Sequence, residues 1–119
     1  MEASTQADPV LLRRVIENLV LNALDAMPTG GKLTFRTAFV ESEDRVTLEI
    51  SDTGAGLTPE ECDRLFTPYY TTKQYGTGLG LAIVQSVVAD HHGTISVESA
   101  PGAGACFVMD LPAAGEAKA

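Results

Sequence analysis

Residues 10–27 carry the strongest periodic pattern in the chain, and any fold of this chain has to bury that segment as a helix. Its apolar side chains recur at helical spacing, at Leu11, Leu12, Val15, Ile16, Leu19, Val20, Ala23, Leu24 and Met27. They cover more than one narrow stripe, so we expect most of the helix to be buried. Asp8 before Pro9 supplies an N-cap and a proline at the first helical position. Pro28 and the glycines after it end the helix.

The rest of the chain alternates strands with two shorter helices. We expect strands at residues 32–40, 45–50, 94–98 and 106–111, and helices at 58–66 and 79–90. Thr58 and Glu61 have the spacing of a capping box, and Gly93 is expected to be the C-cap of the later helix. Because the strands outnumber those of a simple alternating βα order, we predict an α+β fold. Its form would be a two-layer α/β sandwich in which a mixed β-sheet carries helices on one face.

The composition fits one folded domain with an acidic surface. We expect a single domain over residues 1–119 with its core at 8–112, because a chain with 45% hydrophobic content can bury one compact core. The net charge of -8 repels nucleic-acid phosphates, so no nucleic-acid partner is expected. No apolar stretch is long enough to span a bilayer, and we expect a cytoplasmic domain without membrane contact, whatever anchors the parent protein. Cys62 and Cys106 are expected to be free thiols.

Polar residues interrupt the apolar helix at regular places. Asn18, Asn22 and Asp25 are spaced four and three residues apart, which puts them on one helix face. A polar stripe that faces solvent would produce the same pattern. Amide side chains on a largely buried helix need partners, however, and an asparagine oxygen suits a hydrated Mg²⁺ that bridges phosphates. The pattern alone leaves both interpretations open.

A glycine-rich turn follows the second expected strand. Asp52 stands at its start, and Gly54 and Gly56 allow the backbone to turn sharply and to approach a flat ligand closely. A carboxylate at the end of a strand could accept a hydrogen bond from an exocyclic amine such as that of adenine. Taken alone, the segment is better explained as an ordinary Asp-Gly turn.

A second glycine-rich segment leads into the 79–90 helix. Gly76, Gly78 and Gly80 alternate at its N-terminus, where backbone N–H groups and the helix dipole favour an anion. No Gly-Lys-Ser/Thr follows, so this is not a Walker motif, and the spacing differs from the dinucleotide fingerprint. Protein-kinase signatures are absent. A flexible structural loop is the alternative interpretation.

Together these segments resemble the ordered sequence boxes of sensor histidine kinases. Residues 17–23 (ENLVLNA) resemble the N box, 52–57 (DTGAGL) the first glycine box, 65–73 (LFTPYYTTK) the F box, 76–81 (GTGLGL) the second glycine box and 102–107 (GAGACF) the entry to the last strand. The resemblance runs from about Asp8 to Pro112. The F box and a short lid are most similar to the nitrogen-regulation and oxygen-sensing subgroup of these kinases.

The resemblance implies the Bergerat ATP-binding fold, with ATP and Mg²⁺ as ligands. Asn22 would be a catalytic residue that coordinates Mg²⁺, with Asn18 lining the same site, and Asp52 would bind the adenine amino group. Lys73, also implied to be catalytic, and Thr72 would reach the γ-phosphate. The other positions implied to contact the nucleotide are Asp25, Gly54, Gly56, Phe66, Gly76, Thr77, Gly78, Leu79 and Gly80.

The chain departs from the pattern of the family at three places. Asp25 stands where many histidine kinases have a lysine, which removes one phosphate contact. Ala105 stands where threonine is often found, which removes a hydroxyl contact to adenine. The strands usually present upstream are absent or very short, which indicates an N-terminal truncation. The lid over ATP is expected at residues 57–75.

The resemblance also implies a phosphoryl transfer that needs a partner. The chain would bind Mg-ATP and donate the γ-phosphate to a histidine on a separate dimerisation domain, with a response regulator receiver domain acting downstream. His91 and His92 are expected to cap a helix rather than accept phosphate, because no acidic residue follows them. A hydrolytic ATPase of the gyrase or MutL kind is one alternative, although those relatives carry a water-activating glutamate at the position of Asn18. A nucleotide-sensing regulatory module without kinase activity is the other.

Overall fold

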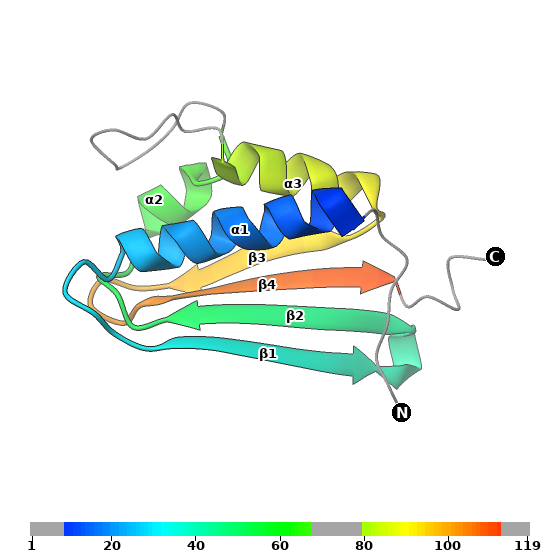
Figure 1. Cartoon of the computed structure of the whole chain (residues 1–119), viewed down its shortest axis with the longest axis horizontal. Helices are drawn as coiled ribbons and strands as arrows, with labels where there is room; N and C mark the ends of the chain where they lie inside the picture. The colour runs from blue at the N-terminus through cyan, green and yellow to red at the C-terminus, as the bar shows by residue number, and fades with distance from the viewer. Residues whose placement is uncertain (1–8, 68–79, 113–119) are drawn as a thin grey trace.

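The computed structural model describes residues 9–67 and 80–112, which fold into two layers (Figure 1). In chain order the elements are α1 (Pro9–Asp25), β1 (Leu33–Val40), the 3-10 turn η1 (Glu41–Glu43), β2 (Arg45–Asp52), α2 (Pro59–Arg64), α3 (Gly80–Asp90), β3 (Thr94–Ser99) and β4 (Ala105–Pro112). The strands form one sheet, and the α-helices of the described residues lie on one face of it. The predicted α+β two-layer sandwich is confirmed.

The strand pairing differs from the mixed sheet that the sequence predicts. The strand order is β1-β2-β4-β3, and every pairing between the described strands is antiparallel. β2 and β3 run in the same direction, as is usual for strands joined through helices, but β4 lies between them (Figure 1). The chain turns directly from β3 into β4, and β4 runs back antiparallel between β2 and β3. No parallel pair can therefore form between β2 and β3.

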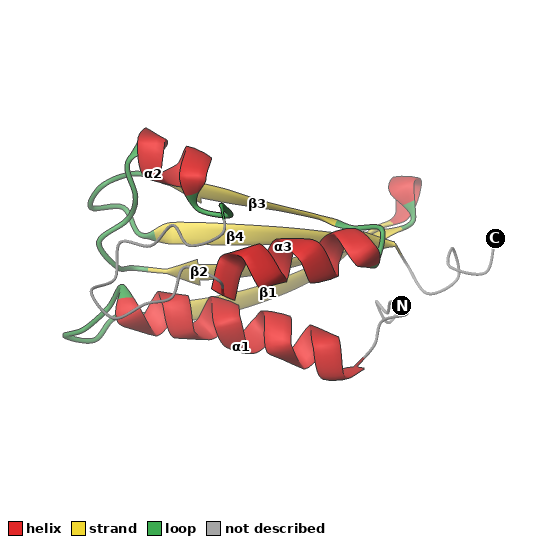
Figure 2. Cartoon of the chain, turned by 90° about the horizontal axis from the view of Figure 1, so that it is seen from above, coloured by secondary structure: helices red, strands yellow, loops and turns green. Residues whose placement is uncertain are grey.

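The hydrophobic core lies between the sheet and helices α1 and α3, which lie side by side above it (Figure 2). Its buried members are Val15, Leu19, Ile50, Val84, Val88, Ala105, Phe107, Met109 and Leu111. β4 supplies every second residue of its length to this core, which is the period of a strand with one face covered. Burial of one large side chain of this kind contributes about 1.5–3 kcal/mol.

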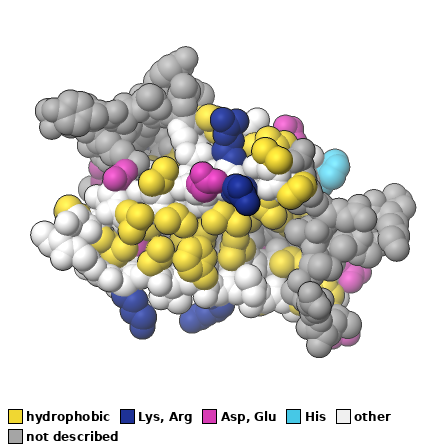
Figure 3. All heavy atoms as spheres, in the orientation of Figure 1, with side chains coloured by type: hydrophobic (Ala, Val, Ile, Leu, Met, Phe, Trp, Pro, Cys, Tyr) yellow, Lys and Arg dark blue, Asp and Glu magenta, His cyan; other side chains and the backbone are white. Residues whose placement is uncertain are grey.

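Helix α1 is less buried than its apolar pattern predicts. Its buried residues form one stripe, Val15, Leu19 and Ala23. Leu21 and Leu24 are 57% and 51% exposed, and Phe35 of β1 is 50% exposed. Figure 3 shows hydrophobic side chains gathered on this side, between α1 and β1. The reason is geometric: α3 packs along one flank of α1, whereas edge strand β1 extends beyond the area that α1 covers.

The helix ends follow local signals, with one shift. Glu61 N–H donates to Thr58 Oγ1 at 3.1 Å and Thr58 N–H donates to Glu61 Oε1 at 2.9 Å, which confirms the capping box of α2. At the end of α3, the expectation that Gly93 is the cap residue is wrong, because His92 takes the left-handed conformation with φ 61°. Gly93 instead packs so closely on β4 that a Cβ would overlap the carbonyl oxygen of Asp110.

Both histidines lie at this helix end, as expected. His92 N–H donates to the Ala89 carbonyl at 3.0 Å and Gly93 N–H to the Val88 carbonyl at 2.9 Å, the bond pattern of a Schellman motif. The ring nitrogen Nδ1 of His91 lies 2.8 Å from the carbonyl oxygen of Val87. The expected position of both histidines at the helix end is confirmed; His91 contacts a helix carbonyl through its ring, whereas His92 takes part through its backbone.

Two expectations drawn from composition concern the cysteines and the bilayer. Cys62 and Cys106 are both free, as predicted. Among the described residues, no helix combines the length and the apolar content that a membrane span requires.

Candidate functional site

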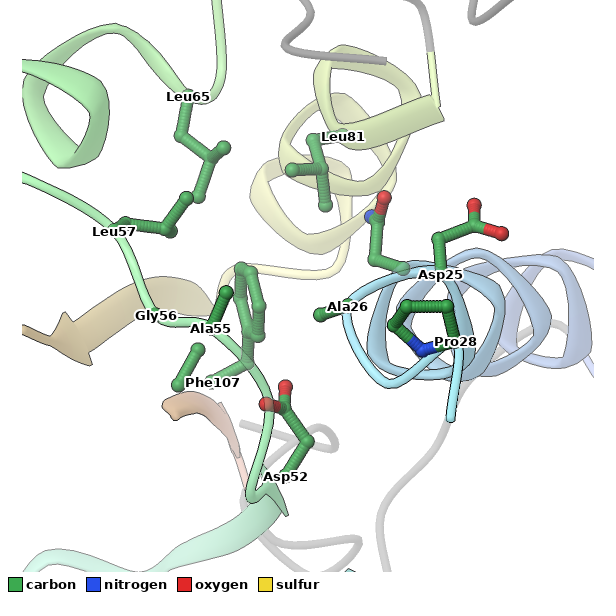
Figure 4. Close-up of a pocket in the computed structure, with 12 residues that line it drawn as sticks. Asp25, Ala26, Pro28, Asp52, Ala55, Gly56, Leu57, Leu65, Leu81 and Phe107 are labelled. Atoms are coloured by element: carbon green, nitrogen blue, oxygen red, sulfur yellow. The ribbon is translucent and has the colours of Figure 1, made fainter. Parts of the chain in front are cut away.

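A cavity opens where α1 ends and β2 runs into the loop that leads to α2 (Figure 4). Its volume is about 500 Å³, in the range of small-molecule sites. The lining residues are Asn22, Asp25, Ala26, Pro28, Asp52, Ala55, Gly56, Leu57, Leu65, Leu81, Ala105 and Phe107. They belong to helices, strands and loops from most of the chain, so the cavity exists only once the whole fold has formed.

Polar residues that the sequence singled out meet on the wall of this cavity. Asn22 and Asp25 lie in the last turn of α1, and Asp52 is the last residue of β2. Figure 4 shows the carboxylates of Asp25 and Asp52 on different walls. No Lys, Arg or His is found among the described residues that line the cavity, so its fixed charge is acidic.

Asp52 is a buried carboxylate, with 8% of its surface exposed. It lies within β2 rather than directly after the strand, in register with Leu33 on one side and Ala105 on the other. The N–H of Gly54 donates to its Oδ1 at 2.8 Å, which fixes the carboxylate. Burying a charged group is costly unless it is paired or hydrogen-bonded, so a carboxylate kept here is a candidate for contact with a ligand.

The loop after β2 is attached to the end of α1. The N–H of Ala55 donates to the carbonyl oxygen of Ala26 at 3.3 Å. Gly54 lies beside the same carbonyl, and a Cβ there would come within 2.5 Å of that oxygen. Gly54 is therefore located behind the cavity wall, against α1, and not on the wall itself.

The hairpin between β3 and β4 holds the other side of the same loop. Gly102 N–H donates to the carbonyl oxygen of Ala55 at 2.7 Å. Leu57 N–H donates to Ser99 Oγ at 2.9 Å, and the Ser99 hydroxyl donates to the carbonyl oxygen of Gly104 at 2.6 Å. The sequence analysis missed Ser99, and no local signal marks it, because Leu57 is 42 residues away in the chain.

Two glycines are required where the loop and the hairpin cross. Gly56 has φ 77°, and a Cβ there would overlap the carbonyl oxygen of Ala100. Gly104 has φ 72°, and a Cβ there would overlap the carbonyl oxygen of Asp52. A side chain at either position would be strained and would push the two segments apart. Gly56 lines the cavity, whereas Gly104 supports the backbone that carries Asp52.

Apolar side chains form much of the remaining wall. Leu57, Leu65, Leu81 and Phe107 all line the cavity (Figure 4). Phe66 is not among the lining residues, but its ring meets the Phe107 ring edge-on, with centroids 6.3 Å apart and an interplanar angle of 86°. The alternation of β4 predicts that Phe107 belongs to a strand, but nothing local indicates that its ring reaches the cavity.

Asn18 lies one helical turn before Asn22, outside the cavity wall. Its Nδ2 donates to the carbonyl oxygen of Arg14 at 3.0 Å. Its Oδ1 lies beside Gly80, where a Cβ would come within 3.0 Å of that oxygen. Gly80 is the first residue of α3, so Asn18 lies at the junction between α1 and the N-terminus of α3.

Part of the predicted site lies outside the described residues. This applies to Thr72, Lys73, Gly76, Thr77, Gly78 and Leu79, and to residues 68–75 of the expected lid. Of the positions inside the described ranges, Asn22, Asp25, Asp52 and Gly56 line one cavity, and Gly54, Phe66, Asn18 and Gly80 lie around it.

The fold and the cavity together define the class of protein. The domain is a two-layer α+β sandwich with a small-molecule cavity between its helices and one end of its sheet.

The sequence matches the family model for histidine kinase-, DNA gyrase B-, and HSP90-like ATPases over residues 7–115. It is 49% identical over 114 residues to sensor histidine kinase ZraS of Klebsiella oxytoca, a match that covers 95% of this chain and 24% of ZraS. Sporulation kinase E of Bacillus subtilis is 40% identical over 105 residues, which are 88% of this chain and 14% of that kinase.

Solved structures share the fold. A mycobacterial sensor histidine kinase, MprB, superposes with a TM-score of 0.83 at 31% identity, over 92% of this chain and 75% of the MprB chain. The catalytic domain of histidine kinase ThkA gives 0.82 at 31% identity, over 94% and 72%. Full-length ShkA, solved in complex with AMPPNP, gives 0.83 at 30% identity, over 95% of this chain and 24% of ShkA.

The chain therefore belongs to the histidine kinase-, DNA gyrase B-, and HSP90-like ATPase family, and within it to the catalytic domains of sensor histidine kinases. It spans about a quarter of the length of the ZraS protein that it matches. The predicted family and fold are confirmed. The assignment to the nitrogen-regulation and oxygen-sensing subgroup stays a prediction.

Proposed function

We propose that this domain binds Mg-ATP and donates the γ-phosphate to a histidine on a separate dimerisation domain of a two-component sensor kinase. The cavity is the observation that carries the proposal, because Asn22 and Asp52, 30 positions apart in the numbering, both line it. The relatives named as sensor histidine kinases support the activity, and the AMPPNP complex of ShkA supports a nucleotide as the ligand.

Asp52 is assigned to the recognition of adenine. Gly54 N–H already occupies its Oδ1, so Oδ2 is the oxygen that would accept from the adenine amino group. Phe107, Leu57 and Leu65 provide apolar contacts that suit a flat ring. Ala105 offers no hydroxyl, so Asp52 carries the side-chain recognition of the base among the described lining residues.

We expect the domain to bind ATP at least about tenfold more tightly than inosine triphosphate, whose ring has a carbonyl oxygen in place of the amino group. The carboxylate of Asp52 would then face another acceptor. Asp52→Asn should reduce the ratio of ATP affinity to inosine triphosphate affinity by about tenfold. The amide nitrogen can donate to the ring carbonyl of inosine triphosphate, while the amide oxygen keeps the bond from Gly54. Calorimetric titrations of both nucleotides in Mg²⁺ measure the ratio. An unchanged ratio in the variant would mean that the base is read elsewhere.

The phosphates are assigned to the space between Asn22 and the N-terminus of α3. An amide oxygen on the cavity wall with a carboxylate beside it is a hard oxygen donor set that fits Mg²⁺, which keeps several waters and bridges phosphates. The N–H groups at the start of α3 near Gly80 favour an anion. The resemblance assigns phosphate contacts also to Gly76, Thr77, Gly78 and Leu79, and γ-phosphate contacts to Thr72 and Lys73.

Asn18 favours transfer to a protein over hydrolysis. An amide has no basicity with which to activate water, and its Nδ2 is bonded to the carbonyl oxygen of Arg14. Phosphoryl transfer itself needs positioning and charge neutralisation rather than covalent chemistry from the domain. The histidine that accepts phosphate and its acidic neighbour would belong to the dimerisation domain.

The proposal also covers the setting of the domain. Residues 1–119 would act as one unit with its core at 8–112, in the cytoplasm, where ATP is available. A response regulator receiver domain would take the phosphate from the dimerisation domain. The net charge of -8 argues against a nucleic-acid partner, and no membrane contact by this domain is proposed.

We expect the isolated chain to bind Mg-ATP without labelling itself, because the His91 ring contacts the Val87 carbonyl and no acidic residue follows His91 or His92 to act as a base. Incubation with γ-labelled ATP, with and without the histidine-bearing dimerisation domain of the parent, measures this. Label should appear on the added domain alone. Label on the chain by itself would refute the split between the two domains. Nucleotide binding without any transfer to the added domain would favour the nucleotide-sensing alternative.

A further inference from the structure

The described part of the cavity wall has the same sign of charge as the ligand that the domain is proposed to bind. ATP carries a polyanionic triphosphate, and the charged residues on the described part of the wall are Asp25 and Asp52. Asp52 is at the base-recognition end, fixed by Gly54. Asp25 is therefore the carboxylate that can act on the phosphates and on whatever neutralises them.

Asp25 lies near Asn22, the residue to which the metal is assigned. It follows Asn22 by three residues, a spacing at which side chains on a helix are neighbours, with Cβ atoms about 5–6 Å apart. Both residues line the cavity, and Figure 4 shows the Asp25 carboxylate projecting from the end of α1. Asp25 is also the last residue of α1, whose last turn has no basic side chain, so the negative end of the helix dipole adds to its charge.

We propose that Asp25 is a specificity-determining residue that makes nucleotide binding conditional on a divalent cation. The inference rests on the proposed Mg-ATP function. A carboxylate beside Asn22 attracts a divalent ion, directly or through its bound water, and repels a phosphate that arrives without one. The domain thereby discriminates metal-bound ATP from free ATP, and the affinity for a nucleoside, which has no phosphate, does not depend on Asp25.

Calorimetric titrations of the full chain test this with three ligands: ATP with excess Mg²⁺, ATP with excess EDTA, and adenosine. In the unmodified chain, we expect metal-free ATP to bind at least about tenfold more weakly than Mg-ATP. Asp25→Asn keeps the shape of the side chain and removes its charge. It should reduce the ratio of Mg-ATP affinity to metal-free ATP affinity by about tenfold without changing adenosine affinity. Asp25→Glu should restore the ratio, because it restores the charge.

Glu17→Gln is the matched control. Glu17 is an exposed acid on the same helix, eight residues before Asp25 and thus about 12 Å away along the axis, and it does not line the cavity. Removing its charge should leave the ratio unchanged. An equal change in Glu17→Gln, an unchanged ratio in Asp25→Asn, or a parallel loss of adenosine binding in Asp25→Asn would each overturn the role of Asp25. If the unmodified chain bound neither Mg-ATP nor adenosine, the proposed function itself would fail, and this inference with it.

Discussion

Replacing Asn22 by alanine is expected to remove Mg²⁺-dependent nucleotide binding and to leave the fold intact. Asn22 lines the cavity from the last turn of α1 and is not part of the hydrophobic core. Alanine is the best helix former, so the substitution does not lower the helix propensity of α1. The amide oxygen assigned to the metal is lost, and a lost contact to a charged group of about 2–3 kcal/mol corresponds to roughly 30-fold to 150-fold in affinity.

Calorimetry in Mg²⁺ and in EDTA separates this effect from damage to the cavity. Mg-ATP should lose most of its affinity for the Asn22→Ala variant, whereas metal-free ATP should bind about as weakly as it binds the unmodified chain, because the charge of Asp25 is still present. Adenosine should bind it as it binds the unmodified chain, because the assigned base contact at Asp52 is on another wall. A thermal melt confirms that the variant is folded. If Mg-ATP affinity were unchanged, the metal would have to be held without Asn22.

The Gly104→Ala variant is expected to be the most destabilised single substitution considered for this chain. At φ 72° a non-glycine residue costs about 1–2 kcal/mol, and the added Cβ would overlap the carbonyl oxygen of Asp52 and come within 3.1 Å of the Cα of Thr53. The overlap involves backbone on both sides, so no side-chain rotation relieves it. We expect a loss of at least about 3 kcal/mol, or failure to fold.

Gly102→Ala is the matched control, because Gly102 has φ 79° and no atom lies within 4 Å of its added Cβ. It shares the conformational cost and lacks the overlap, so we expect a loss of about 1–2 kcal/mol. Urea unfolding followed by circular dichroism measures both free energies of unfolding. Equal losses would show that the hairpin moves aside freely. That result would remove the argument that close backbone contact beneath Asp52 requires glycine at position 104.

Much of the local structure could be predicted from the sequence. The helix and strand positions and the capping box of Thr58 and Glu61 follow from the chemistry of neighbouring residues, and the structure confirms them. Boundaries moved by only a few residues, as when β2 was found to include Asp52. These features depend on contacts a few residues apart, which a sequence displays directly.

Part of the candidate site could be predicted as well, although for a different reason. Asn22, Asp25, Asp52 and Gly56 were singled out by motif and by resemblance, and they line one cavity. Phe107 and Ser99 were missed, because their importance comes from where the hairpin of β3 and β4 meets the loop after β2. Nothing in the residues beside them in the chain indicates that meeting.

The sequence by itself determined the elements, their caps and the residue types available for a nucleotide site, because these depend on propensity and short-range hydrogen bonds. Only the tertiary structure decided that β4 lies between β2 and β3, that one stripe of α1 is buried, and that His92 rather than Gly93 takes the left-handed conformation. Each of these outcomes depends on which surfaces pack together across the chain. The position of Asp25 beside Asn22 on an acidic wall joins both levels: helical spacing makes them neighbours, and the fold closes the cavity in front of them.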